Sequence, residues 1–232
     1  MTTTTKSIKE IPLPAARLAI ATSVAILLLL ALLHVLSPEF GPSWRMVSEY
    51  ALGHYGWVLS LMFIAWAVSS WALAVAIWGQ IKTVAGKIGL WFLVAAGLGE
   101  AMASVFDITH DVLHGVAGLL GIGGLPIAAL LISTSLGHAE RWYSAKKALL
   151  MTAHLTWISV VLLIGSLVVM TMQFAKVYGG QLPQQAPLEL PAGVLGLDGW
   201  ADRFLILAFC AWVITVAWHA IRVRAQNQSE KM

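Results

Sequence analysis

Charged side chains are scarce in this sequence. Asp, Glu, Lys and Arg together make up 11% of the 232 residues, about half the share of a typical soluble domain. No segment concentrates them, whereas a nucleic-acid-binding protein usually carries a basic patch or stripe. We therefore expect no nucleic acid among the partners of this chain.

Cysteine is almost absent as well. Cys210 is the only one, and it lies within an apolar run. A single cysteine excludes a disulfide within one chain and a metal cluster held by several thiolates of that chain. Cys210 is therefore predicted to be a small buried apolar residue.

Apolar residues dominate instead, at 59% of the chain with a mean hydropathy of +0.82. Runs of about twenty such residues need a bilayer rather than a water-facing core. The sequence predicts an all-α, polytopic integral membrane protein with a cytoplasmic tail at 1–16, a transmembrane domain at 17–221 and a second cytoplasmic tail at 222–232. The six predicted transmembrane helices are Arg17–Leu36, Tyr55–Gly79, Gly86–Phe106, Gly115–Leu136, Leu149–Phe174 and Ala201–Ile221.

The distribution of basic residues predicts the orientation of these helices. With the N-terminus in the cytoplasm, eleven basic residues lie on the cytoplasmic side and three outside, as the positive-inside rule requires. We therefore expect a multi-pass protein of the plasma membrane with both termini in the cytoplasm. The cytoplasmic set is Lys6, Lys9, Arg17, Lys82, Lys87, Arg141, Lys146, Lys147, Arg222, Arg224 and Lys231, and the outer set is Arg45, Lys176 and Arg203.

The first apolar run resembles a signal peptide, because basic residues precede its leucine-rich core. The following stretch "LLHVLSPEF" has no small-x-small cleavage pattern. We therefore expect this run to remain as the first transmembrane helix.

Ionisable residues gather on the predicted outer side, most densely in "FDITHDVLHG" at 106–115. Asp107, His110, Asp111 and His114 fall within eight residues there. The 51 residues from Gly86 to Leu136 suffice for two spans and a turn, so this stretch is predicted to be the turn. Asp107 would end the third span, Thr109 or Asp111 would cap the fourth, and His114 would lie in its first turn. Polar residues at an exposed turn, and an Asp at a helix start, need no further role.

An acidic residue inside the membrane is harder to explain. Glu100 lies about two turns within the third span, where an unpaired carboxylate is costly. Arg203, at the outer start of the last span, is its expected partner. Such a pair is either a structural tie between helices or part of a functional site.

Three chemistries use these groups. Carboxylates and imidazoles bind zinc and similar divalent ions, and His110 and His114 have a spacing of four residues. Candidate metal ligands are therefore His110, His114, Asp107, Asp111 and His34.

Hydrolysis is the second chemistry that uses these groups. Ser48 in "MVSEYALG" is a candidate nucleophile beside an Asp–His pair, although no nucleophile-elbow motif surrounds it and a loop hydroxyl or helix cap is the simpler explanation. Haem ligation is the third, because His154 and His219 lie at similar depth on the last two spans, as in a cytochrome b.

Four stretches resemble a prokaryotic membrane family, domain of unknown function 998. They are "HVLSPEFGP", "SEYALGHYGW", "FDITHDVLHGVAG" and "GWADRFLI", and the likeness covers nearly the whole chain. It implies six spans and draws attention to Ser48, Asp107, His114 and Arg203. The last stretch has Asp202 where the family leads us to expect Glu. More loosely, the outer Ser, Asp and His groups resemble those of the alkaline ceramidase and adiponectin-receptor superfamily, although the paired His-x-x-x-His of a late span is missing.

The sequence thus predicts an outward-facing site with Asp107, Ser48, Arg203 and Glu100 as candidate catalytic residues. Its leading interpretation is a metal-dependent, lipid-modifying hydrolase with a divalent ion such as zinc, in contact with the lipid bilayer and a lipid substrate. The alternative is a non-enzymatic transporter or membrane accessory protein in which acids and histidines relay protons or tie helices together.

Overall fold

The computed structural model describes residues 10–180, 187 and 189–229. Lys6, Lys9 and Lys231 of the predicted topology, and most of the predicted tail 1–16, lie outside these residues. The described chain is helical throughout, without a strand, which confirms the predicted fold class.

Six segments are long and apolar enough to cross a membrane, in agreement with the predicted number. The first three are α1 (Leu13–Leu36), α2 (Gly56–Ile77) and α3 (Val84–Val105). The fourth comprises α4 (Asp111–Gly118), a short π-helical segment η2 (Leu119–Gly123) and α5 (Gly124–Gly137). The last two are α6 (Lys146–Val177) and α7 (Asp198–Ser229), with the short 3₁₀ helices η1 (Val47–Leu52) and η3 (Glu140–Ala145) in connections.

Five of the six predicted spans agree with the structure within four residues at each end, and α7 extends eight residues beyond the end of its predicted span. Helix α1 starts at Leu13 rather than Arg17, because Pro12 and Pro14 suit the first helical turn. Helix α7 continues to Ser229, so residues 222–229 of the predicted C-terminal tail are helical. Thr83 caps α3 by accepting a hydrogen bond from the Gly86 N–H.

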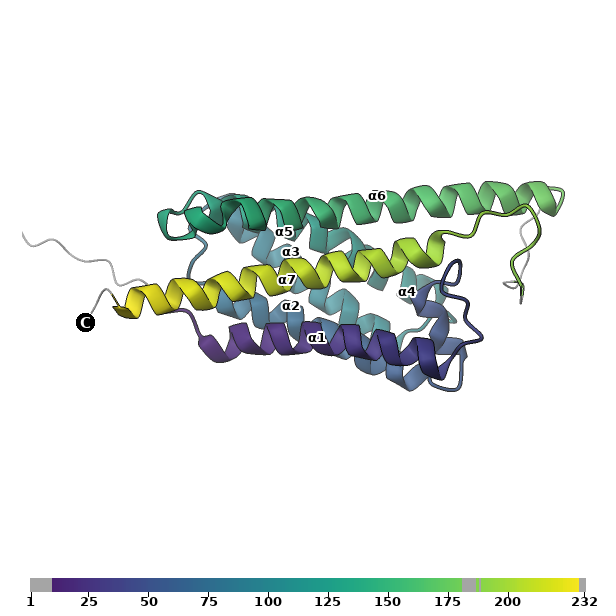
Figure 1. Ribbon diagram of the computed structural model, residues 1–232, viewed down its shortest axis with the longest axis horizontal. Helices are drawn as coiled ribbons and strands as arrows, with labels where there is room; N and C mark the ends of the chain where they lie inside the picture. Colours follow the sequence, from purple (N-terminus) through teal and green to yellow (C-terminus); the bar gives the residue numbers. More distant parts are fainter. Residues whose placement is uncertain (1–9, 181–186, 188, 230–232) are drawn as a thin grey trace, which may run out of the picture.

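The spans form a closed bundle. Each packs against the next, α1 on α2, α2 on α3, α3 on α5, α5 on α6 and α6 on α7, and α7 closes the ring by packing on α1 (Figure 1). Helices α2 and α7 are the most buried spans and α6 is the least. Groups that face inward from α2, α3 and α7 are therefore shielded from lipid.

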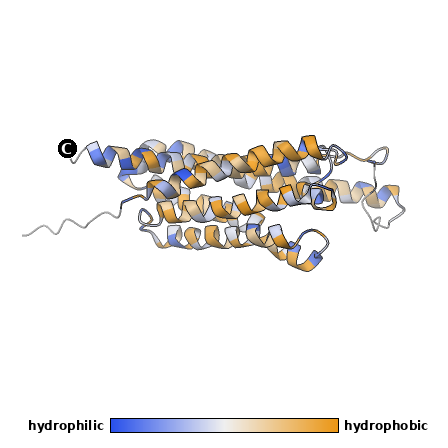
Figure 2. Ribbon diagram, turned by 90° about the horizontal axis from the view of Figure 1, so that it is seen from below, coloured by the Kyte–Doolittle hydropathy of each residue, from blue (hydrophilic) through white to orange (hydrophobic). Residues whose placement is uncertain are grey.

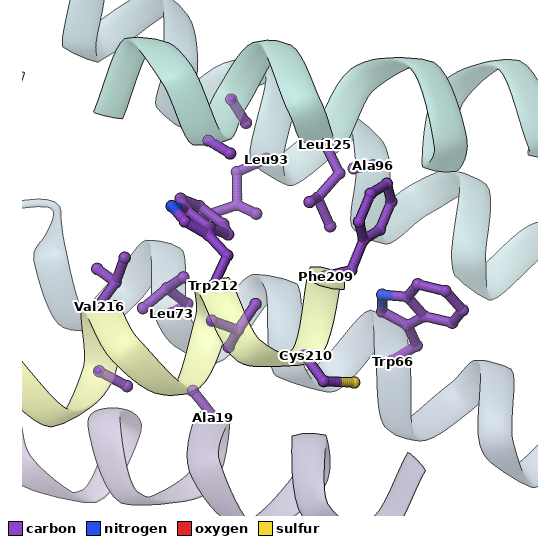
Figure 3. Packing of buried hydrophobic residues seen from close by; sticks show 14 of the residues in the cluster. Ala19, Trp66, Leu73, Leu93, Ala96, Leu125, Phe209, Cys210, Trp212 and Val216 are labelled. Carbon is purple, nitrogen blue, oxygen red and sulfur yellow. The ribbon is translucent and has the colours of Figure 1, made fainter. Parts of the chain in front are cut away.

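Aromatic and small residues fill the centre of the bundle. Trp66 of α2 packs edge-on against Phe209 of α7, and Trp212 reaches the Leu93 side of the core (Figure 3). Large apolar side chains such as Leu28, Trp91 and Val161 are exposed on the outer surface of the helices. Because the bilayer is as apolar as these side chains, this surface is suited to lipid contact (Figure 2).

The two ends of the bundle differ. Helix α1 begins and α7 ends at one end, which we call the terminal end (Figure 1). The other, the polar end, carries η1, the α3–α4 turn and the start of α7. Both stretches that the sequence singles out at 48 and 106–115 therefore lie at the polar end.

Candidate functional site

Arg203 binds several elements together at the polar end. Its Nε donates to His34 Nε2 at 2.7 Å, and one terminal nitrogen donates to the carbonyl oxygens of Arg45 and Gly199. The other terminal nitrogen donates to the Tyr50 hydroxyl at 3.1 Å. Arg203 is only 4% exposed, so its guanidinium ties α1, the α1–η1 connection, η1 and α7 together in a buried network.

The expected pairing of Glu100 with Arg203 is wrong. Glu100 Oε2 accepts a hydrogen bond from the Ser70 hydroxyl of α2 at 2.8 Å, and Oε1 is buried without a hydrogen-bond partner. Arg203 instead uses its donors on His34, Tyr50 and two carbonyl groups. The sequence shows how deep Glu100 and Arg203 lie along their helices, but it does not show in which direction around the helix each side chain points. The predicted pairing relied on depth alone and was therefore wrong.

His34 differs from the prediction as well. Its Nδ1 lies 2.6 Å from the Leu30 carbonyl oxygen, and its Nε2 accepts the bond from Arg203. Both ring nitrogens are therefore occupied, and the tautomer is the one with the proton on Nδ1. His34 supports the arginine in this structure and offers no free nitrogen to a metal ion.

The α3–α4 turn lies where the sequence predicts it, but its contacts are local. Asp107 Oδ1 accepts hydrogen bonds from the Thr109 backbone and hydroxyl and lies 3.2 Å from His110 Nδ1. The bonds from Thr109 hold the pKa of Asp107 below its ordinary value. His110, rather than Thr109 or Asp111, occupies the N-cap position of α4, without a side-chain cap bond. Asp107 and His110 thus pair with each other on the surface.

His114 has a different environment, one turn into α4. Its Nδ1 lies 2.9 Å from the Phe106 carbonyl oxygen, so Nδ1 carries the proton and donates it. Nε2 is then the basic nitrogen. The side chain is half-buried and lines two hollows in the bundle.

The first hollow, which we call the inner cavity, has a volume of about 100 Å³. It lies among α2, α3, the fourth span and α7. Its lining is mainly apolar, with four polar or ionisable side chains among the described residues: Ser48, Glu100, His114 and Asp202. The structure therefore brings three of the predicted site residues, Ser48, Glu100 and His114, to one cavity.

The second hollow, which we call the entrance hollow, measures about 570 Å³ and opens at the surface between η1, α4 and α6. Asp111 and Glu49 line it, together with apolar side chains that include Ile108, Met170 and Phe174. Met46, Ser48 and His114 line both hollows. These three residues lie between the inner cavity, which Glu100 also lines, and the entrance hollow, and we call them the neck.

Helix η1 holds Ser48 at the neck through its neighbours. The Val47 N–H donates to Asp202 Oδ2 at 2.7 Å, which fixes η1 to α7. Glu49 accepts from the Met46 N–H and lies 3.0 Å from Arg45 Nε. Burial raises the pKa of Glu49, against the opposing effect of Arg45. Ser48 therefore lies on a short helix that is held in place by the contacts of the residues before and after it.

The predicted metal ligands are dispersed. In the described part of the chain, no group of three or more His, Cys, Asp or Glu side chains is placed to hold a metal ion. Asp111 and His114 line the entrance hollow, Asp107 and His110 pair at the turn, and His34 binds Arg203. The histidines of the haem hypothesis are also apart, since His154 is exposed on α6 while His219 lines a hollow at the terminal end with Arg141 and Arg222.

Several residues of the site are missed by the sequence reasoning. From the sequence, Asp202 is notable only as the acid before Arg203 at the start of the last span, and its place in the lining of the inner cavity is not predicted. Phe63, Trp66 and Phe209 line the inner cavity, but aromatic residues in an apolar span carry no signal of their own.

Comparison with known proteins supports the architecture. No curated protein and no solved structure matches the chain. A family model described as "Protein of unknown function (DUF998)" matches residues 20–219, which includes most of the first and last spans, all of the four spans between them and the whole candidate site. The chain therefore belongs to the DUF998 family of membrane proteins.

Proposed function

We propose that this protein is a lipid-modifying hydrolase of the plasma membrane, with its site on the non-cytoplasmic side. The observation that carries the proposal is that Ser48 and His114 both line the neck between a surface hollow and a buried cavity. A hydroxyl nucleophile and an imidazole base at one neck are the basic equipment of acyl transfer. The excess of basic residues at the opposite end supports the orientation.

The tautomer of His114 suits it to act as the base. Because the Phe106 carbonyl oxygen accepts the Nδ1 proton, Nε2 is free to take a proton from Ser48. The Ser48 oxygen then attacks the carbonyl carbon of an ester or amide, and His114 returns the proton to the departing alcohol or amine. Water, deprotonated by His114, releases the acid and restores Ser48.

The shapes of the two hollows indicate how an amphipathic substrate lies. A cavity of roughly 150 Å³ holds a benzene ring, so the inner cavity of about 100 Å³ takes a small group rather than an acyl chain. The entrance hollow is larger and has Met170 and Phe174 of the lipid-facing α6 in its wall. In this proposal the chain of the lipid lies in the entrance hollow and its bond to a small group lies at the neck.

A fluorophosphonate probe tests the nucleophile directly, because it labels activated serines. We expect labelling of the purified protein at Ser48, found by peptide mass spectrometry, and its loss in Ser48→Ala and His114→Ala. Ser104→Ala is the matched control, since its hydroxyl bonds to the Ala101 carbonyl outside the cavity. Labelling that persists in both site variants would refute the proposal.

The divalent ion predicted from the sequence is a separate proposal from the Ser48 nucleophile. Asp111 and His114, which line the same hollow, would hold it together with groups from solvent or substrate. Metal analysis of the purified protein tests this. About one zinc per chain, lost in the double variant His110→Ala/His114→Ala, would assign the nucleophile to metal-bound water instead of Ser48.

A second candidate is a transporter that moves protons with its cargo. It is favoured by one observation, the buried carboxyl group of Glu100 in a cavity that shares the neck residues with the entrance hollow at the surface. Proton uptake by liposomes that contain the protein, abolished in Glu100→Gln and unchanged in Ser48→Ala, would support this function over hydrolysis.

A further inference from the structure

Glu100 is held in one orientation and offers one oxygen to the inner cavity. The Ser70 hydroxyl donates to Oε2, while Oε1 has no partner and its residue is 4% exposed. A buried carboxyl oxygen without a partner is costly unless a ligand supplies a donor. Ser70 therefore positions the carboxyl group, and Oε1 is the oxygen left without a donor in a residue that lines the inner cavity.

Three aromatic rings line the same cavity. Phe63 and Trp66 stack with ring centroids 6.3 Å apart, and Phe209 meets Trp66 edge-on at 5.9 Å. The faces of aromatic rings carry partial negative charge, and rings that line one cavity form the aromatic cages that bind quaternary ammonium ligands. Figure 3 shows Trp66 of α2 and Phe209 of α7 side by side in the core.

The charge of the lining has one sign. Glu100 and Asp202 contribute carboxyl groups, and no lysine or arginine is among the described residues around the cavity. Asp202 already accepts from the Val47 N–H, whereas Glu100 has only the bond from Ser70. A bound cation would be stabilised in this cavity, because both the carboxylate and the faces of the aromatic rings attract it.

From this arrangement we infer that the inner cavity binds a substituted ammonium group, with Glu100 as its counter-ion and Trp66, Phe63 and Phe209 as its walls. The cavity of about 100 Å³ suits such a small group. Only the origin of the ligand rests on the proposed function: the part of the lipid that is released as alcohol or amine would carry the ammonium group.

Calorimetric titration of the protein in phosphatidylglycerol nanodiscs tests the binding, with choline as the probe. The matched probe is 3,3-dimethyl-1-butanol, which has the same shape without the charge. We expect saturable binding of choline and at least a tenfold weaker affinity for the alcohol. Equal affinities would overturn the inference, because the cavity would then be an apolar pocket only, and this comparison requires no variant.

Variants then assign the binding to named side chains. Glu100→Gln keeps the shape and the bond from Ser70 but removes the charge, so choline affinity should fall at least tenfold. Trp66→Leu should weaken it as well. Glu140→Gln and Trp91→Leu are the controls, since Glu140 and Trp91 are exposed and lie outside the cavity. Unchanged affinity in Glu100→Gln would contradict the inference.

Two further measurements distinguish a lipid ligand from a free amine, and the ammonium site from the hydrolase. Phosphatidylcholine in the nanodiscs should compete with choline if the ammonium group belongs to a lipid, and should leave its affinity unchanged if the ligand is a free amine. Two separate readouts distinguish the proposals: choline binding is compared between the parent protein and Glu100→Gln, and probe labelling of Ser48 is compared between the parent protein and Ser48→Ala. A failure of the hydrolase proposal would thus leave choline binding intact, and a failure of the ammonium site would leave labelling of Ser48 intact.

Discussion

At the scale of single residues, Arg203 and Glu100 have separate tasks. Arg203 supplies four hydrogen bonds that hold the polar end together, and Glu100 bonds only to Ser70. They have no hydrogen-bond partner in common among the described residues. Arg203 is therefore part of the scaffold, whereas Glu100 is part of the site.

A double-mutant cycle should show this separation. Arg203→Gln leaves buried acceptors without donors, each at a cost of about 1–3 kcal/mol, and should lower the free energy of unfolding by about 3 kcal/mol or more. Glu100→Gln should cost less. Because the residues share no partner, the double variant should equal the sum of both within about 0.5 kcal/mol. A coupling clearly above that value, measured by denaturant unfolding in micelles, would mean that the two residues interact after all.

Asp107 provides a prediction on pH. Hydrogen bonds from Thr109 lower its pKa in the folded protein, so the unfolded chain takes up the proton at higher pH than the folded chain. The stability that the turn gains is present above the ordinary Asp pKa of about 3.9 and is lost as the pH falls through the lowered value. Melting temperatures between pH 6 and 3 should therefore drop more steeply for the parent than for Asp107→Asn. Identical profiles would show that the turn contributes nothing measurable.

At the scale of elements, the fourth span approaches α3 through glycines. A Cβ on Gly99 would lie 2.5 Å from the Ala117 carbonyl oxygen and 2.7 Å from the Gly121 nitrogen, both backbone atoms. The π-helical segment η2 lies at this contact, and such segments often occur at functional sites. The close approach brings α4, and with it His114, over the inner cavity that Gly99 and Gly121 help to line.

Gly99→Ala should therefore destabilise the protein and disturb the candidate site. Overpacking of this kind costs about 1–3 kcal/mol, and the displaced α4 should also weaken probe labelling at Ser48. The control is Gly165→Ala on α6, where a Cβ would meet nothing within 4 Å and the helix should gain about 0.5–1 kcal/mol. Thermal unfolding of the two variants measures the difference. A neutral Gly99→Ala variant would contradict the tight contact.

The sequence predicts these elements better than it predicts the site. Apolar runs report the spans directly, because the bilayer demands about twenty apolar residues regardless of packing. The clustering of Asp107, His110, Asp111 and His114 marks the turn but not where each side chain points, and only His114 lines the inner cavity. Ser48 and His114 are candidates by residue type and spacing, and the family resemblance draws attention to them as well. The three rings that line the inner cavity with Glu100 cannot be identified from the sequence, because the spans are apolar on all sides and the sequence does not show which face is buried.

At the scale of the whole molecule, the two ends of the bundle carry different groups. Helices α1 and α7 place their free ends together, and most basic residues of the described chain lie near that end (Figure 1). The polar end collects the neck, the entrance hollow and the Arg203 network. A substrate would reach the neck from the surface that faces away from the cytoplasm in the proposed orientation.

Reporter fusions test this orientation. A reporter after Met232 should be cytoplasmic, and one inserted at Gly193 should be external, where nothing lies within 4 Å of an added Cβ. Opposite sides are expected because one span, α7, lies between Gly193 and the C-terminus, and because the basic residues favour the cytoplasm. Reporters on the same side, or with the sides exchanged, would place the site elsewhere.

The central claim, that Ser48 and His114 form the active centre of a lipid hydrolase, is tested most directly by the fate of lipids beside the purified protein. Nanodiscs that contain the protein and a mixture of phosphatidylcholine, phosphatidylethanolamine and sphingolipids would be incubated and analysed by mass spectrometry. The account predicts hydrolysis products of an ammonium-bearing lipid with the parent protein and Ser104→Ala, and a loss of at least a hundredfold in rate with Ser48→Ala and His114→Ala. Hydrolysis that proceeds equally in all four proteins, or no product from any ester or amide lipid, would contradict it.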